Sequence, residues 1–398
     1  MEMKLRKLWP LFGAVCLGLT STVFAHSNYQ NSSSSSSTYG SSADSSSQSG
    51  QETYQRGTFR EITPSAGPRV AHGADVFITA DLIWWKTTQS GLEYGASGFI
   101  NEGPTPPAIA DVFNIQAPKG KLHTVGEDWS PGFKVGLGLN MSHDGWDLYA
   151  QYTWLHSSDK NSTTRPIAAS RFGLVESGGG SGPFVIAQRA NSDWDLHFNV
   201  IDLELGRNFY LSQFLTMRPF IGLKGTWQDQ NWKSHYFDGD FTLRVDDPNN
   251  NDQLSVTGPY HIHDSQDNWG IGVRGGFNVS WYMSKNWSFY GDFAWTTLLT
   301  KYDTDRKDTL DDTANGTTHS VRMLYINNDS FYAVKYIGEL ELGLRWETWF
   351  YDDNYHFAIQ AGWEEQVWIN WFRPPEVIDE ASHDLSFHGL NLKFRFDF

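Results

Sequence analysis

Cysteine is almost absent from this 398-residue chain, and the single one, Cys16, lies in an apolar stretch near the start. Basic residues are also scarce, because 30 Lys and Arg stand against 46 Asp and Glu, for a formal net charge of −16. A chain with no basic stripe has little to neutralise phosphates with, so nucleic acid is excluded as a partner. Beyond the first 25 residues no run of about 18 apolar residues occurs, which excludes a transmembrane helix in the remaining sequence.

The first 25 residues have the pattern of a secretory signal peptide. Three basic residues, Lys4, Arg6 and Lys7, precede the apolar run from Leu8 to Leu19, and a small residue, Ala25, offers a cleavage site. We therefore expect residues 1–25 to be removed. Their loss takes away three basic residues and one acidic residue, so the net charge falls from −16 to −18. The mature chain then has no cysteine and cannot form a disulfide.

The next stretch, residues 26–69, is rich in serine and then interrupted by Pro and Gly. Such a composition cannot bury enough apolar surface to order itself. We expect a disordered periplasmic tail here, followed by a single folded domain over residues 70–398.

The final stretch, from Leu385 to Phe398, alternates large apolar and polar residues. A period of two indicates a strand with one apolar face, and not a helix. A last amphipathic strand that ends in Phe resembles the C-terminal signal by which bacterial outer-membrane barrels are recognised for insertion, which implies the barrel assembly machinery as a partner. An edge strand of a soluble sheet is the alternative. The residues of the predicted assembly signal are Leu390, Leu392, Phe394, Phe396 and Phe398.

The same alternation recurs along the chain and predicts ten strands, with twelve as the alternative. The clearest case is Phe133 to Met141, where apolar residues alternate with Lys, Gly and Asn. Pro219 is an irregularity in one strand, because proline removes a donor from the hydrogen-bond ladder. The predicted strands are Val76–Lys86, Phe133–Met141, Trp146–Leu155, Trp194–Tyr210, Phe214–Gln228, Trp269–Met283, Trp287–Leu299, Val334–Phe350, Tyr355–Trp371 and Leu385–Phe398.

The predicted connections alternate strictly between long and short. The long ones are Thr87–Pro131, Ser157–Asp193, Asp229–Asn268, Thr300–Ala333 and Phe372–Asp384, whereas the short ones have three or four residues. Outer-membrane barrels have long external loops, short periplasmic turns and an even number of strands. The fold class predicted is therefore all-β, an antiparallel up-and-down transmembrane β-barrel in the bacterial outer membrane, in contact with its lipid.

Aromatic residues are abundant, at 15% of the chain with 18 Trp. Trp281 and Trp287 flank one predicted short turn, and Trp154 and Trp194 flank one predicted long loop. Tryptophan gathers at the membrane–water interfaces of such barrels, so we expect these four side chains in the interfacial girdles.

The inward face of the predicted strands carries charges of both signs in nearly balanced numbers. Paired charges can close a lumen as a structural network, whereas opposed charges across a wet lumen create a transverse field that selects small polar solutes. Ten strands lie near the closed end of the range between filled and open barrels. The predicted lumen-lining residues are Asp81, Lys134, Asp147, Asp202, Glu204, Arg218, Lys224, Arg274, Asp292, Lys335, Glu339, Glu341, Arg345, Glu347, Glu364, Lys393 and Arg395.

Signals of catalysis or metal binding are weak. His261 and His263 would share one face of a strand, which is the beginning of a metal site, but a solvated loop explains them as well. A protease at the external rim would use Asp and His, and the candidates for such a set are His156, Asp159, Asp303 and Asp305. Their spacing does not exceed chance in such polar stretches. The sequence thus predicts no enzyme, no cofactor and no metal.

Several stretches resemble a known family, the Legionella and environmental-chlamydia major-outer-membrane-protein-like, pore-forming proteins. They are ADLIWWK (80–86), WSPGFKVGLGLN (129–140), WDLYAQYTWLH (146–156), LELGRNFYLSQFLTMRPFIGLKGTW (203–227) and HGLNLKFRFDF (388–398). The resemblance implies a porin-like pore for passive diffusion of small hydrophilic solutes or ions, with no catalytic residues. The alternatives are a non-conducting structural or adhesive barrel and a rim-located protease. Whether the protein forms a homo-oligomer is left open.

Overall fold

The computed structural model describes residues 66–68, 70, 75–97, 120–141, 144–164, 167–169, 185–238, 240–243, 254–257, 259–314, 317–375 and 382–398. The predicted signal peptide and most of the predicted tail lie outside these residues. The folded part belongs to one compact unit, Glu61–Phe398. Within the described residues no helix is long and apolar enough to cross a membrane.

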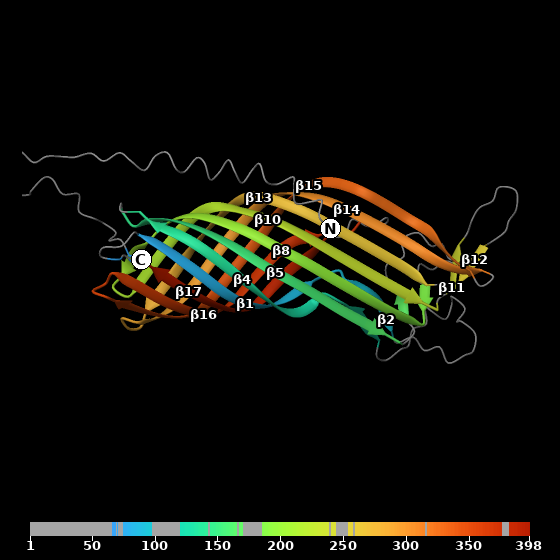
Figure 1. Ribbon diagram of the computed structural model, residues 1–398, viewed down its shortest axis with the longest axis horizontal. Coiled ribbons are helices and arrows are strands. Elements are labelled where there is room, and N and C mark those ends of the chain that lie inside the picture. Colours follow the sequence, from blue (N-terminus) through green and yellow to red (C-terminus); the bar gives the residue numbers. More distant parts are fainter. Residues whose placement is uncertain are drawn as a thin grey trace, which may run out of the picture. The chain divides into compact units, whose positions relative to one another are not determined.

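Ten strands form a closed antiparallel ring, as predicted (Figure 1). They are β1 (Val76–Gln89), β4 (Glu127–Asn140), β5 (Trp146–Thr163), β8 (Arg189–Arg207), β10 (Leu215–Phe237), β13 (Tyr260–Tyr282), β14 (Trp287–Ala314), β15 (Thr317–Phe350), β16 (Tyr355–Phe372) and β17 (His383–Asp397). Each pairs with the next ring strand along the chain, and β17 pairs with β1 to close the ring. The topology is therefore up-and-down.

Seven shorter strands complete the regular structure. They are β2 (Glu93–Ser97), β3 (Lys121–Thr124), β6 (Ile167–Ala169), β7 (Val185–Ala187), β9 (Phe209–Ser212), β11 (Asp240–Leu243) and β12 (Leu254–Thr257). Strands β3, β2, β6 and β7 form one small sheet, and β11 and β12 form a hairpin. Strand β9 pairs with β10 beyond the end of β8.

Proline at position 219 is tolerated because of this break between β8 and β9. The pairing of β10 with β8 ends at Phe220 opposite Gly206, and the pairing with β9 resumes at Met217 opposite Phe209. On this side Pro219 therefore lies at a gap in the ladder, whereas on its other side it lies opposite Phe277 in the continuous ladder with β13.

The two ends of the ring differ in their connections. At one end, which we call the short-turn end, tight turns join β4 to β5, β13 to β14 and β15 to β16. One of these turns contains Asp144 and Gly145, both with positive φ (59° and 74°). Such a pair matches the twist of an antiparallel hairpin, and Asp-Gly adopts it readily. The opposite end is called the long-loop end.

The outer face of the ring carries an apolar band, as the alternation predicts. Leu137 and Leu342 are each 58% exposed, and their strand neighbours point inward or are small. Leu203 and Phe277 are also exposed, and Ile359 is half-buried but alternates with the buried Ala358 and Gln360. A band of exposed Leu, Ile, Val and aromatic side chains around a closed ring is the lipid-facing surface of a membrane barrel.

Beyond this band, toward the long-loop end, the apolar face of the strands switches from outside to inside. Strand β8 shows the switch at Val200 and Ile201. From Ile201 onward the apolar side chains are outside, whereas before it the apolar side chains Trp194, Leu196 and Phe198 are inside and buried. The ring thus has two parts, a membrane part with a polar lumen and an extension whose interior combines aromatic and aliphatic side chains with buried polar ones such as Arg306 and Asp308.

This switch explains why the strands are longer than predicted. The stretches Asp229–Asn268 and Thr300–Ala333 are predicted to be loops, but nearly all of the second continues β14 and β15, and the two ends of the first continue β10 and β13. Strands β14 and β15 stay paired as far as Ala314 and Thr317. In these continuations the residues still alternate between the two faces, but the apolar ones point inward. A prediction that follows outward apolar residues therefore ends each strand too early. Between the two ends of Asp229–Asn268, β11 and β12 form a hairpin.

One predicted girdle position is wrong. Trp194 is only 1% exposed and lies inside the extension, because it falls on the inward set of β8. Trp281 and Trp287, at the short-turn end, are exposed on the outer face, and Trp154 is half-buried and stacks on Phe133 at 5.5 Å. These three positions agree with an interfacial girdle.

Candidate functional site

The lumen of the membrane part holds a polar cavity of about 160 Å³. A cavity of this size is large enough to hold several water molecules. Most of the predicted lumen-lining residues surround it: Asp81, Lys134, Asp202, Glu204, Arg218, Lys224, Arg274, Asp292, Glu339, Glu341, Arg345, Glu364, Lys393 and Arg395.

Three predicted lumen residues lie elsewhere on the inner face. Asp147 is buried and accepts hydrogen bonds from Arg218, so it faces inward without lining the cavity. Lys335 is buried, with its ammonium group on the backbone carbonyl of Asn370 toward the long-loop end. A carboxylate oxygen of Glu347 lies 3.8 Å from a ring nitrogen of His356, near the short-turn end.

Two arginines connect strands that are not neighbours in the ring. Arg218 of β10 pairs with Asp147 of β5 at 2.5 Å and with Glu204 of β8 at 2.8 Å. Arg274 of β13 contacts Glu204 and pairs with Glu339 of β15 at 2.8 Å. Guanidinium groups present several donors in a fixed fork, which suits them to bridging two carboxylates.

Lysines extend this network. Lys224 of β10 lies 3.0 Å from Asp202 of β8 and 3.0 Å from Glu339 of β15. Lys134 of β4 donates to both oxygens of Glu364 of β16, at 2.7 and 2.6 Å. We call the acidic and basic residues joined in these two paragraphs the charged layer. Its charges are paired across the lumen, so the nearly balanced count expected from the sequence corresponds to ion pairs.

Aromatic side chains fill the lumen at the start of the extension. Phe198 of β8 packs edge-on against Trp368 of β16 with 5.2 Å between ring centroids, and it lies 4.6 Å from Phe387 of β17. Trp371 packs on Trp368 at 4.6 Å and donates from Nε1 to Gln228 of β10. These residues are the aromatic layer. In the ring order β8 and β16 are five strands apart out of ten, so the contact between Phe198 and Trp368 crosses the full lumen.

The short-turn end of the lumen is contacted by the residues that precede β1. The backbone N–H of Ala66 donates to the carbonyl of Asn208 at 3.1 Å, and Asn140 donates to the carbonyl of Pro68 at 3.4 Å. Gly67 and Pro68 also line the cavity. Residues 66–68, which composition assigns to the tail, are thus bound to the barrel.

A scan against protein families matches residues 68–398 to the Legionella pneumophila major outer membrane protein precursor family. The chain belongs to this family. As a Legionella major outer membrane protein family member with a closed barrel, it is a protein of the bacterial outer membrane. The resemblance inferred from the sequence motifs is confirmed, and so is the predicted location.

Other comparisons add only similarity of a general kind. No curated protein matches the chain. Among solved structures, the outer membrane protease OmpT from Escherichia coli has a TM-score of 0.34 and 9% identity, covering 81% of this chain and 96% of the protease. The Pseudomonas putida toluene transporter TodX has a TM-score of 0.26 and 8% identity, covering 81% of this chain and 89% of the transporter.

The rim residues considered for a protease are not brought together in this family member. His156 and Asp159 lie on opposite faces of β5, and Asp159 accepts the backbone N–H groups of Gly126 and Glu127. Asp303 and Asp305 lie on β14, four strands away from β5 in the ring, and Asp303 pairs with a neighbouring lysine.

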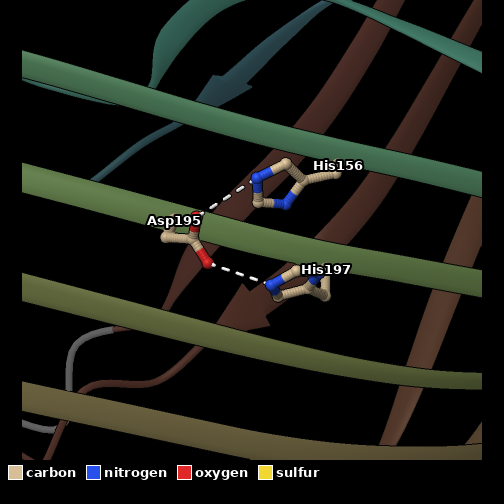
Figure 2. A group of neighbouring side chains, drawn as sticks. All are labelled: His156, Asp195 and His197. Atoms are coloured by element: carbon tan, nitrogen blue, oxygen red, sulfur yellow. Dashed lines mark ion pairs between the residues drawn. The ribbon is translucent and has the colours of Figure 1, made fainter.

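Two histidine groups do form on the outer face of the extension. His156 of β5 meets Asp195 and His197 of β8 (Figure 2). His261, which the sequence singled out, contacts His235 of β10 through the Nδ1 atoms, whereas His263 has Lys233 and Lys307 as its cross-strand neighbours. Burial and the neighbouring His261 lower the pKa of His235.

Sequence reasoning missed both the aromatic layer and the group around His156. The inward phase of β8 before Val200 could have indicated Phe198, but Phe387 and Trp368 belong to distant strands and nothing in their spacing indicates that they meet it. The pair Asp195 and His197 has the i, i+2 spacing of one strand face. Only the register of β8 with β5 places His156 beside them.

Proposed function

We propose that this protein is an outer-membrane pore for passive diffusion of small hydrophilic solutes or ions, and that the aromatic layer is its constriction. The observation that carries the proposal is the polar cavity in the membrane part, lined by charges of both signs. Opposed charges across a wet lumen favour small polar solutes over apolar ones. The proposed partners are outer-membrane lipid, the barrel assembly machinery and the solute itself.

Passage through such a lumen requires movement of the aromatic layer. Phe198, which lines the cavity, meets Trp368 across the ring. Apolar constrictions in channels block ions by excluding water, and they open when their side chains move apart. We therefore expect the wild-type pore to conduct little, with infrequent openings.

A second candidate function is a non-conducting structural barrel. Two observations favour it: the charged layer is paired across the lumen, and the aromatic layer fills it. A lumen that is closed by the charged layer in the membrane part and by the aromatic layer at the start of the extension is consistent with a barrel that transports no solute. The two candidates make opposite predictions for conductance.

Single-channel conductance in planar bilayers separates them. The test compares the purified wild type with Trp368→Ala, which removes the ring that meets Phe198, and with the matched control Trp363→Ala. Trp363 lies on the same strand, on the outer face and 42% exposed, so its removal leaves the lumen unchanged. The pore proposal expects a several-fold rise in conductance or open probability for Trp368→Ala and none for the control.

Folding is checked separately, by circular dichroism and by the mobility shift that folded barrels show on unheated gels. If the folded wild type and the folded Trp368→Ala variant are both silent, the pore proposal fails and the structural barrel stands. If both conduct equally, the protein is a pore but the aromatic layer is not its constriction.

A further inference from the structure

The group formed by His156, Asp195 and His197 lies on the outer face of the barrel, beyond the apolar band. His156 is directly opposite His197 in the register of β5 with β8, and Asp195 is two residues along β8 on the same face. All three side chains are half-buried, so they are held by the sheet yet accessible from outside. Figure 2 shows the carboxylate of Asp195 turned toward both imidazole rings.

The two imidazole–carboxylate distances in this group are longer than those of good hydrogen bonds and close to the spacing of two metal ligands. Nε2 of His156 lies 3.5 Å from one carboxylate oxygen of Asp195, and Nε2 of His197 lies 3.4 Å from the other. A good hydrogen bond to a carboxylate would bring these atoms to about 2.7–2.9 Å. Two ligands of a tetrahedral Zn²⁺ at about 2.0–2.1 Å from the ion are about 3.4 Å apart.

We propose that His156, Asp195 and His197 form a binding site for a divalent transition metal of the Zn²⁺ class. Two imidazoles and one carboxylate are a common ligand set for Zn²⁺, and they leave a fourth position open. The ligand atoms of the three residues all lie within 4.8 Å of one another. Closing the group around an ion requires rotation of the two half-exposed imidazole rings, whose centroids are 4.3 Å apart.

The strands supply the rigidity that the site needs. His156 and His197 occupy paired positions in a ladder that runs from Trp146–Arg207 to Thr163–Ala190, so their backbones are fixed relative to each other. Sites built on strands are held more closely than sites built on loops. The open position faces away from the lumen, so the metal has no part in solute passage and the site is independent of the proposed pore.

The pair His235 and His261 is the competing site in the same molecule. Its Nδ1 atoms are in contact, and Nε2 of His261 lies 3.2 Å from a carboxylate oxygen of Asp311. The Asp311 carboxylate lies beside Nε2 of His261, whereas His235 faces Nδ1 of the same ring. Only two ligand atoms therefore point at a common centre. The group around His156 offers three, which is why we assign the site there.

The test uses the full mature protein, purified without a polyhistidine tag, and titrates it with Zn²⁺ by calorimetry and with Co²⁺ by absorption spectroscopy. We expect one site per chain and visible bands of tetrahedral Co²⁺. His156→Ala and His197→Ala should each weaken binding at least about 100-fold, and Asp195→Asn at least about 10-fold. The matched control His235→Ala should leave affinity and spectrum unchanged.

Each other outcome overturns the proposal. Absence of Zn²⁺ binding by the folded wild type shows that the three residues form an ion-pair group only. Binding that survives both His156→Ala and His197→Ala lies elsewhere, and loss with His235→Ala places it at the competing pair. Since the variants change outward-facing side chains, the gel mobility of the folded barrel verifies that each has folded before it is titrated.

Discussion

Replacing Lys134 with methionine should destabilise the barrel strongly, because it leaves a buried carboxylate without its cation. The ammonium group of Lys134 lies 2.7 and 2.6 Å from the two oxygens of Glu364, and the two side chains are 7% and 6% exposed. Breaking a buried ion pair from one side costs about 3–5 kcal/mol. Glu364 would keep Gln366 at 2.8 Å and Asn391 at 3.1 Å as donors, so we expect the lower end, about 3 kcal/mol.

The assay is urea unfolding of the reconstituted barrel, followed by tryptophan fluorescence and extrapolated to water. The double variant Lys134→Met, Glu364→Gln removes both charges, and it should recover to within about 1 kcal/mol of the wild type. The control is Lys86→Met. Lys86 pairs with Glu127 at 3.3 Å, but the two side chains are 29% and 50% exposed, so its loss should cost about 0–1 kcal/mol.

Two results would refute this reasoning. Lys134→Met within about 1 kcal/mol of the wild type would mean that water in the cavity, and not the lysine, satisfies Glu364. A double variant as unstable as the sum of the two single variants would mean that the two residues do not interact.

Three further predictions concern the membrane face, the topology and the lumen. Leu342→Arg, in the apolar band, should cost about 2–4 kcal/mol, whereas Tyr332→Arg on the same strand and face but beyond the band should cost little; equal refolding yields would contradict the two-part barrel. Once Cys16 is lost with the expected signal peptide, no native thiol remains, so Lys307→Cys should react with an impermeant thiol reagent on whole cells and Lys285→Cys, at a short turn, should not. The reverse labelling would invert the barrel. If the wild type conducts, Glu341→Lys should shift the reversal potential toward anions, because Glu341 lines the cavity. Lys307→Glu should not, because Lys307 is exposed at the outer rim. Unchanged selectivity of Glu341→Lys would mean that Glu341 does not line the ion pathway.

The alternation of apolar and polar residues was enough to predict the ring. It placed Leu137 and Leu342 on the outer face, and it put Lys134, Glu341 and Arg274 on the inner face, where the structure has them. Period two determines sides, because each residue along a strand points opposite to the last.

The same pattern could not show where the strands end or what meets across the lumen. The strands continue past the membrane part, and there polar residues take the outward positions. On β8 the outward residues after Val200 are apolar, so they do not indicate that Asp195 and His197, which precede Val200, also face outward. The partners of Glu339 and Phe198 lie on strands that are distant both in sequence and in the ring. Such contacts depend on ring closure, strand tilt and side-chain length, which local spacing does not contain.

Ring closure has a consequence for the timing of assembly. The seam joins the first ring strand to the last, and Val76 and Phe398 exchange two backbone hydrogen bonds, at 3.3 and 3.0 Å. No pairing in the ring separates its partners further along the sequence, so loop-closure entropy makes this the slowest step to form by chance. Until the last strand arrives, β1 and its unfinished neighbours present open edges that other chains can join. The ring therefore has no open edge between β1 and β17 only once these two strands have paired.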